Sequence, residues 1–401
     1  MPSFLPQFPF ATNPLLLFGL LLLAGLIGGE LARRYARLPR VVGYVLVGLG
    51  LGAGGLNVLD ERLVQEAWIF VDMALGLILF ELGRRLDLGW FRRDPWLAAT
   101  GLLESALSFA LVMGALVYFD VRPIYAAVAA SIAIATSPAV VMVVAQELRA
   151  EGQVTERALS LVAINSVIAF VTSTMLLAVI HHEYQAGWQT AVLHPLYLLA
   201  GSLLLGYGAS LAAVALARGF GRPDRWHFVV MLALVVVTVG VARMLELSVV
   251  LALLVFGVLS RSLDQRHELL PFEMGRIGAM FVVVLFVLGG ATLQVQDLVA
   301  GGGVALVFIL ARFVGKSVGV LALTWLSGVR RGAAGLLCLT LTPMSGLAVS
   351  MVQGTANLYP EFGASLAAIV LSAVLILELI GPVAVQFALK RAGEAADEEE
   401  R

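Results

Sequence analysis

Four ionisable side chains stand in the middle of long apolar stretches, where no water is available to solvate a charge. Arg312 and Lys316 are four residues apart, so in a helix they lie one turn apart on the same face. Glu104 and Glu378 lie within two other apolar stretches. Because a charge inside a bilayer is costly, such groups pair with one another or serve an ion or proton pathway. We therefore predict that the two bases are balanced mainly by the two acids.

Two apolar segments are interrupted by proline beside hydroxyl-bearing residues. A proline inside a helix removes a backbone donor and frees carbonyl oxygens, which lipid cannot satisfy. We therefore expect two discontinuous helices, broken at Thr136–Pro138 and Thr342–Gly346, that cross near the membrane centre. Paired breaks in two halves indicate the substrate site of a secondary transporter. The alternative is a pair of proline kinks without a binding role.

A neutral polar pair, Asn165 and Ser166, interrupts a further apolar stretch. Such side chains either bond across a helix interface or line a pathway. The predicted ion and proton pathway accordingly consists of Thr136, Ser137, Thr342, Ser345, Asn165, Ser166, Glu104, Arg312, Lys316 and Glu378.

The composition indicates the fold class in which these residues are held. At 60% hydrophobic and 13% charged residues, with a mean hydropathy of +0.95, the chain is typical of an all-α polytopic membrane protein. The single Cys338 excludes a disulfide framework, and the five histidines show no metal-ligand spacing. No nucleophile–base pair, phosphate-binding loop or nucleic-acid motif occurs. We expect no enzyme activity, no cofactor, no metal site and no nucleic-acid partner.

Hydropathy, with breaks at charged residues and prolines, predicts about thirteen transmembrane helices. The broken segments are the fifth and the twelfth of these spans. The predicted spans are 14–32, 40–58, 64–83, 96–118, 123–147, 155–180, 190–217, 227–245, 247–260, 273–293, 298–327, 332–353 and 363–389.

The basic residues predict how the chain crosses the membrane. Of the 26 Lys and Arg residues, 21 follow odd-numbered spans, 3 follow even-numbered spans and 2 lie within a span. Because Lys and Arg gather in cytoplasmic loops, we expect the N-terminus outside and the C-terminus inside, with the acidic tail Glu394 to Glu400 as a solvated end. The two breaks lie an odd number of spans apart, so corresponding helices run in opposite directions. This indicates an inverted repeat of spans 1–6 and 8–13 joined by span 7.

The ordered set of motifs resembles the membrane domain of the monovalent cation:proton antiporter superfamily, which includes sodium/proton exchangers and Kef-type potassium efflux proteins. The resemblance covers nearly the whole chain, and Arg312 with Lys316 looks like the basic positions of the helix that faces the ion site. The segments that carry it are Leu38-Pro39-Arg40-Val41-Val42-Gly43-Tyr44, Leu79-Phe80-Glu81-Leu82-Gly83-Arg84-Arg85-Leu86-Asp87, Ala135-Thr136-Ser137-Pro138-Ala139-Val140-Val141 and Glu378-Leu379-Ile380-Gly381-Pro382.

The resemblance implies a core that moves against a scaffold, through which the protein forms a homodimer. Small residues of span 2, namely Gly48, Gly50, Gly52 and Gly54, would permit close approach of helices in such a dimer. The implied units are scaffold 1–95 and 226–297, core 96–180 and 298–390, connector 181–225 and acidic tail 391–401.

The chain departs from the family pattern in its sixth span. The family uses a carboxylate there, usually written Asn-Asp, Asp-Asp or Gln-Asp, whereas this chain has Asn165-Ser166. A serine hydroxyl neither titrates near neutral pH nor supplies a charge to hold a bare cation. Either another group titrates, with Glu104 and a desolvated Lys316 as candidates, or the fold serves as a channel, an anion or small-solute carrier, or a sensor subunit.

The resemblance also implies the partners and the location. It indicates an alternating-access antiporter of Na+ or K+ against protons, in the inner (plasma) membrane of the cell. A separate regulatory subunit is compatible with this function.

Overall fold

The computed structural model describes most of the chain. The secondary structure in the described part is helical, which confirms the all-α prediction. The described residues are 14–59, 61–86, 89, 94–183, 188–220, 225–264, 275–344, 346, 348–349, 351–352, 355 and 360–396.

Each of the predicted spans overlaps at least one of the observed helices, so the predicted order of helical segments is confirmed. By length and composition, 8 helical segments could cross a membrane, and shorter apolar helices accompany them in the described residues. The helices are α1 (Pro14–Ala36), α2 (Arg40–Leu51), α3 (Glu61–Arg85), α5 (Pro95–Tyr118), α6 (Pro123–Ile134), α7 (Pro138–Glu147), α8 (Gln153–Glu183), α9 (Trp188–Phe220), α10 (Arg225–Met244), α11 (Val249–Leu263), α12 (Gly275–Ala291), α13 (Val295–Leu323), α14 (Arg331–Thr340) and α16 (Pro360–Ala392).

The two proline-containing spans are interrupted as predicted. Helix α6 ends at Ile134 and α7 begins at Pro138, where the Ser137 hydroxyl accepts a hydrogen bond from the Val140 N–H at 3.3 Å. Helix α14 ends at Thr340, and the residues up to Met344 are not helical. The inverted repeat stays a prediction.

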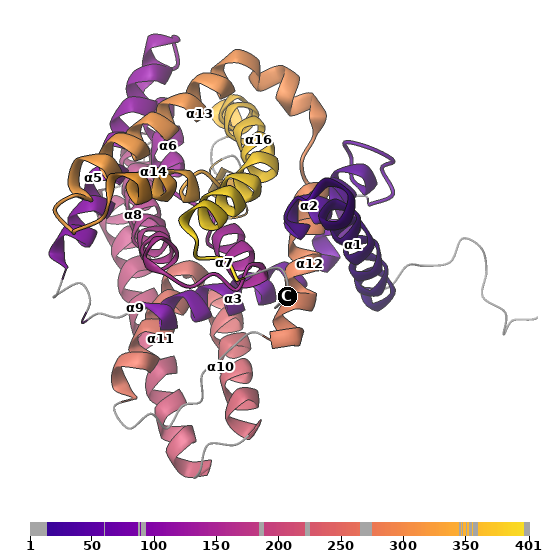
Figure 1. Cartoon of the computed structure of the whole chain (residues 1–401). Coiled ribbons are helices and arrows are strands. Elements are labelled where there is room, and N and C mark those ends of the chain that lie inside the picture. Colours follow the sequence, from indigo (N-terminus) through magenta and orange to yellow (C-terminus); the bar gives the residue numbers. More distant parts are fainter. Residues whose placement is uncertain are drawn as a thin grey trace, which may run out of the picture.

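The broken segments lie inside the helical bundle (Figure 1). In this view α6, α7, α14 and α16 lie together, while α1 and α2 lie to one side and α10 and α11 below. Of the 18 most apolar consecutive residues in the Pro123–Glu147 segment, 94% are buried, whereas only 22% are buried in the corresponding stretch of Leu15–Ala36. Interrupted backbone is therefore covered by protein, as a low-dielectric setting requires.

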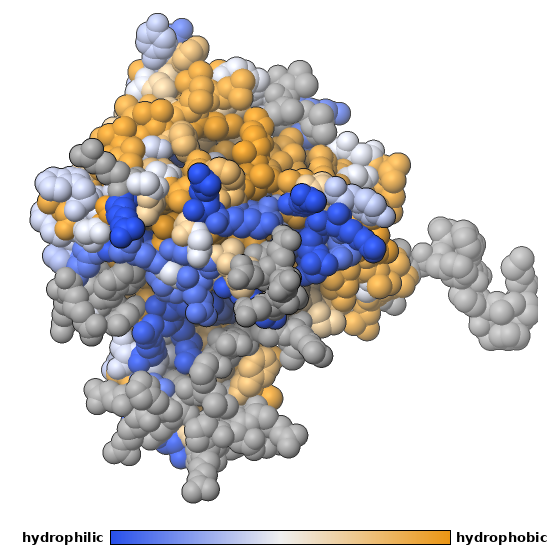
Figure 2. Space-filling view, in the orientation of Figure 1, coloured by the Kyte–Doolittle hydropathy of each residue, from blue (hydrophilic) through white to orange (hydrophobic). Residues whose placement is uncertain are grey.

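The surface separates hydrophobic from hydrophilic side chains. Figure 2 shows a hydrophilic band across the middle of one face, with hydrophobic surfaces on both sides of it. Large side chains such as Leu15, Leu23 and Ile27 of α1 are more than half exposed. Such an apolar exterior suits contact with lipid.

Two surface segments differ in part from what the sequence predicted, and the homodimer stays a prediction. Gly48 and Gly52 already pack against α12 of the same chain, because a Cβ atom at either would lie within 2.3 Å of a backbone oxygen of α12. They therefore add no support for a dimer contact. Glu394 is only partly exposed, and its carboxylate accepts hydrogen bonds from the backbone N–H groups of Val154 and Thr155, at 2.7 and 2.8 Å; residues 397–400 of the predicted solvated tail lie outside the described residues. Glu394 caps the N-terminus of α8, where a negative charge is favourable.

Candidate functional site

The two breaks are in direct contact. The Ser137 N–H donates a hydrogen bond to the carbonyl of Pro343 at 3.0 Å, and the Thr136 hydroxyl donates to the carbonyl of Leu341 at 3.3 Å. Backbone groups that left one helix are thus satisfied by the other broken segment. The crossing that the prolines predicted is confirmed as a contact between the breaks.

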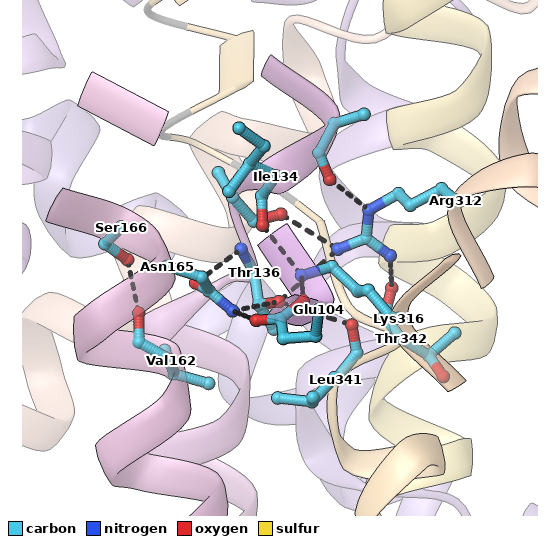
Figure 3. Close-up of polar contacts among 12 residues, drawn as sticks. Glu104, Ile134, Thr136, Val162, Asn165, Ser166, Arg312, Lys316, Leu341 and Thr342 are labelled. Atoms are coloured by element: carbon cyan, nitrogen blue, oxygen red, sulfur yellow. Dashed lines mark hydrogen bonds and ion pairs between the residues drawn. The ribbon is translucent and has the colours of Figure 1, made fainter. Parts of the chain in front are cut away.

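Arg312 of α13 satisfies the carbonyl oxygens that the breaks release. Its guanidinium donates to the carbonyls of Ala133 at 2.9 Å, Ala135 at 2.8 Å, Thr342 at 2.9 Å and Pro343 at 3.3 Å (Figure 3). A planar fork with five N–H donors is suited to such a divergent set of acceptors. Arg312 therefore holds both broken segments together through their backbones.

Lys316, one turn further along α13, forms the ion pair of the site. Its Nζ lies 2.8 Å from Oε2 of Glu104 and 2.7 Å from the carbonyl oxygen of Ile134. The side chains of the pair are only 2% and 0% exposed. The predicted balance between a core base and Glu104 is confirmed.

Asn165 connects this ion pair to the first break. Its amide nitrogen donates to Glu104 at 3.1 Å and to the Thr136 hydroxyl at 3.0 Å, while its oxygen accepts from the Thr136 N–H at 3.2 Å. Both the nitrogen and the oxygen of the carboxamide therefore form hydrogen bonds. The carboxylate of Glu104 consequently has partners from α8 and α13, as Figure 3 shows.

Ser166 does not belong to this network. Its hydroxyl donates to the carbonyl of Val162 at 2.7 Å, within α8, and lies apart from the other polar side chains in Figure 3. Thr342 contributes its carbonyl, whereas its buried hydroxyl has no hydrogen-bond partner in the described residues. Ser345 lies outside the described residues.

Glu378 of α16 does not balance Arg312, so this part of the predicted pairing is wrong. The physical reason is that the guanidinium already donates its hydrogen bonds to the carbonyls of the two breaks. Glu378 is 3% exposed and lines a separate cavity with Trp68 of α3 and with Thr292, which directly follows α12.

Close packing of α13 against α5 brings Lys316 to Glu104. A Cβ atom at Gly319 would lie 2.3 Å from Cα of Glu104, and one at Gly315 would lie 2.6 Å from Cα of Ser108. The sequence reasoning missed these two glycines. Their spacing of four residues, on either side of Lys316, was the available signal, because small residues in that pattern let membrane helices approach closely.

Crossed broken helices around a buried ion pair define a membrane protein of the secondary-transporter class. Residues 18–391 match the family described as "Sodium/hydrogen exchanger, transmembrane", and the chain belongs to that family. The resemblance stated from the motifs is therefore confirmed.

Individual proteins resemble the chain to different extents. Over 103 residues it is 35% identical to the Na(+)/H(+) antiporter NhaS5 of Synechocystis sp., a match that spans 26% of this chain but only 14% of that relative's length. The structure of the sodium proton antiporter MjNhaP1 from Methanocaldococcus jannaschii at pH 8 has a TM-score of 0.67. It is 16% identical, and the match covers 95% of this chain and 97% of that one. An electron-microscopy structure of MjNhaP1 has a TM-score of 0.72, with 16% identity and coverages of 95% and 98%.

Proposed function

We propose that the protein exchanges a monovalent cation, Na+ or K+, for a proton by alternating access. The observation that carries the proposal is the fully buried ion pair of Lys316 and Glu104 beside the contact between the breaks. Protonatable groups inside a membrane protein are retained where a pathway needs them. Membership of the sodium/hydrogen exchanger family supports the same class of activity.

The chemistry of exchange follows from what Lys316 touches. While its ammonium is charged, it occupies the carboxylate of Glu104 and the carbonyl of Ile134, which are oxygen ligands suited to a small cation. A cation gains access to these oxygens when Lys316 gives up its proton and withdraws. The proton and the cation thus compete for the same oxygens, which is the requirement for coupled exchange.

The charge at the crossing predicts the stoichiometry. Within the described residues the network contains two bases, Arg312 and Lys316, and one acid, Glu104. Arg312 stays protonated, so binding one cation in place of the proton of Lys316 leaves the total charge unchanged. We infer electroneutral exchange of one proton for one cation at this site.

The mechanism needs a mobile core and a fixed scaffold. We propose that residues 96–180 and 298–390 form the core, and that residues 1–95 and 226–297 form a scaffold that also holds a homodimer together. Span 7, within 181–225, would connect the two halves. The basic loops support an extracellular N-terminus and a cytoplasmic C-terminus in the inner (plasma) membrane.

One observation favours a second candidate, an antiporter fold that no longer exchanges cations. Ser166 stands where the family pattern has a carboxylate, and its hydroxyl is bonded to Val162 rather than directed to the crossing. Such a protein would serve as a channel, an anion or small-solute carrier, or a sensor subunit. It would show no cation-dependent proton movement.

Flux in proteoliposomes distinguishes the two candidates. The purified full-length protein is reconstituted, a pH gradient is imposed, and Na+, K+ or choline is added while the internal pH is recorded. Antiport predicts that Na+ or K+ collapses the gradient and choline does not, without any effect of membrane potential. A gradient that persists with both metal cations would contradict the proposal and favour the second candidate.

A further inference from the structure

A second buried carboxylate lies away from the crossing, in a small cavity between helices. Glu378 of α16 shares this cavity with Trp68 of α3, Phe286 of α12, Thr292 directly after α12, and Ala139 of α7. Ala139 directly follows the proline of the first break. The cavity thus lies where α16 and α7, from the proposed core, meet α3 and α12, from the proposed scaffold.

Two glycines fix the position of this carboxylate. A Cβ atom at Gly381 would lie 2.7 Å from Cα of Pro343, so α16 approaches the second break closely, one turn beyond Glu378. A Cβ atom at Gly289 of α12 would lie 3.4 Å from Oε1 of Glu378. The carboxyl group therefore faces α12 across the interface, while its helix is packed against the break.

The carboxyl group of Glu378 has no partner in the described part of the chain. It forms no ion pair or hydrogen bond there, and the other residues that line its cavity are uncharged. Charged side chains on the helices packed around it are engaged elsewhere. They include Asp72 with Arg243, Arg62 with Glu66, Glu81 with Arg85, Arg40 with Glu147, Lys316 with Glu104, and Arg312 with the carbonyls of the breaks.

The cavity suits a proton and one water rather than a metal ion. It leaves about 20 Å³ for the centres of water-sized molecules, and one water needs about 10–15 Å³. A cation such as Na+ requires several oxygen ligands, whereas the cavity offers the carboxylate and the Thr292 hydroxyl, which already donates to the Gly289 carbonyl at 2.8 Å. An ionised carboxylate in this setting would be left uncompensated, at a high energetic cost.

We propose that Glu378 is a second proton-binding site, separate from the ion pair at the crossing. A proton from the surrounding solution, relayed by water in the cavity, binds to the carboxylate and converts it to a neutral carboxylic acid. As a neutral group it can move along the apolar surface of α12 when the core shifts against the scaffold. This last step rests on the proposed transport cycle, whereas proton binding by Glu378 does not.

Infrared spectroscopy tests proton binding directly. The full-length protein in lipid bilayers at neutral pH should show the carbonyl-stretching band of a protonated carboxylic acid, and Glu378→Gln should lose that band. Glu81→Gln is the matched control, because Glu81 is equally buried but has Arg85 at 3.2 Å and Gln146 at 2.7 Å as partners, and it should keep the band. Absence of the band from the unaltered protein, or its persistence in Glu378→Gln, would overturn the proposal.

The pH dependence of exchange tests the role of this proton in transport. Glutamine is isosteric with the neutral acid and cannot ionise, so a folded Glu378→Gln should continue to exchange at more alkaline pH than the unaltered protein does. If a folded Glu378→Gln lost exchange at every pH, this would contradict the proposal that Glu378 moves along α12 as a neutral group. If the unaltered protein exchanges no cation, the antiport proposal fails while the infrared result still decides whether Glu378 binds a proton.

Discussion

Glu104 and Glu378 are both buried in apolar helices, yet their surroundings differ completely. Glu104 receives the ammonium of Lys316 and the amide of Asn165, whereas Glu378 faces an uncharged cavity. Partners therefore compensate a negative charge on the first, whereas a negative charge on the second would be uncompensated within the described residues. The neighbours assembled by helix packing, rather than the residue type and its depth, therefore decide what a buried carboxyl group does.

Glu104→Gln should be the most destabilising single change, because it leaves Lys316 as an uncompensated buried charge. We expect a loss of about 3–5 kcal/mol, measured as a fall in the thermal unfolding midpoint in mild detergent. The double change with Lys316→Met should recover part of the loss, since it removes the stranded charge. Equal midpoints for the single and the double variant would show that the ion pair is not a unit.

Arg312→Lys should have the next largest effect. A lysine keeps the charge but cannot donate to carbonyls of both breaks at once, so several charge-assisted hydrogen bonds are lost. We expect a destabilisation of about 2–3 kcal/mol. The same thermal measurement checks this, with Arg243→Lys as the control, because Arg243 is more than half exposed in its pair with Asp72. A destabilisation no larger than that of the control would contradict the role of Arg312 in joining the breaks.

Glu378→Gln should have the smallest effect of the three. Glutamine replaces a neutral acid of the same shape, and we expect a change within about 1 kcal/mol at neutral pH. At alkaline pH, where the unaltered protein must bury a carboxylate or unfold, the variant should be the more stable of the two. Thermal unfolding across a pH series measures this. A variant that loses as much stability as Glu104→Gln would remove the contrast between the two sites.

The sequence predicted the spans, the two breaks and the pairing of Glu104 with a base, because each follows from local chemistry. Proline at mid-helix predicts a break, and an isolated charge predicts a partner. It did not predict that Arg312 would bond to carbonyls, since the direction of freed backbone groups depends on how the helices are assembled. For the same reason, the glycines of span 2 suggested an external contact although α12 already covers Gly48 and Gly52.

Ser166 provides the sharpest test of where the exchange chemistry lies. Proton flux driven by an inward Na+ or K+ gradient should be compared in proteoliposomes containing the unaltered protein, Ser166→Ala and Glu104→Gln at equal folded content. We expect Ser166→Ala to keep most of the flux, because the Ser166 hydroxyl donates its hydrogen bond within α8, whereas Glu104→Gln should abolish the flux. Loss of flux in Ser166→Ala with retention in Glu104→Gln would contradict the assignment of exchange to the pair of Lys316 and Glu104.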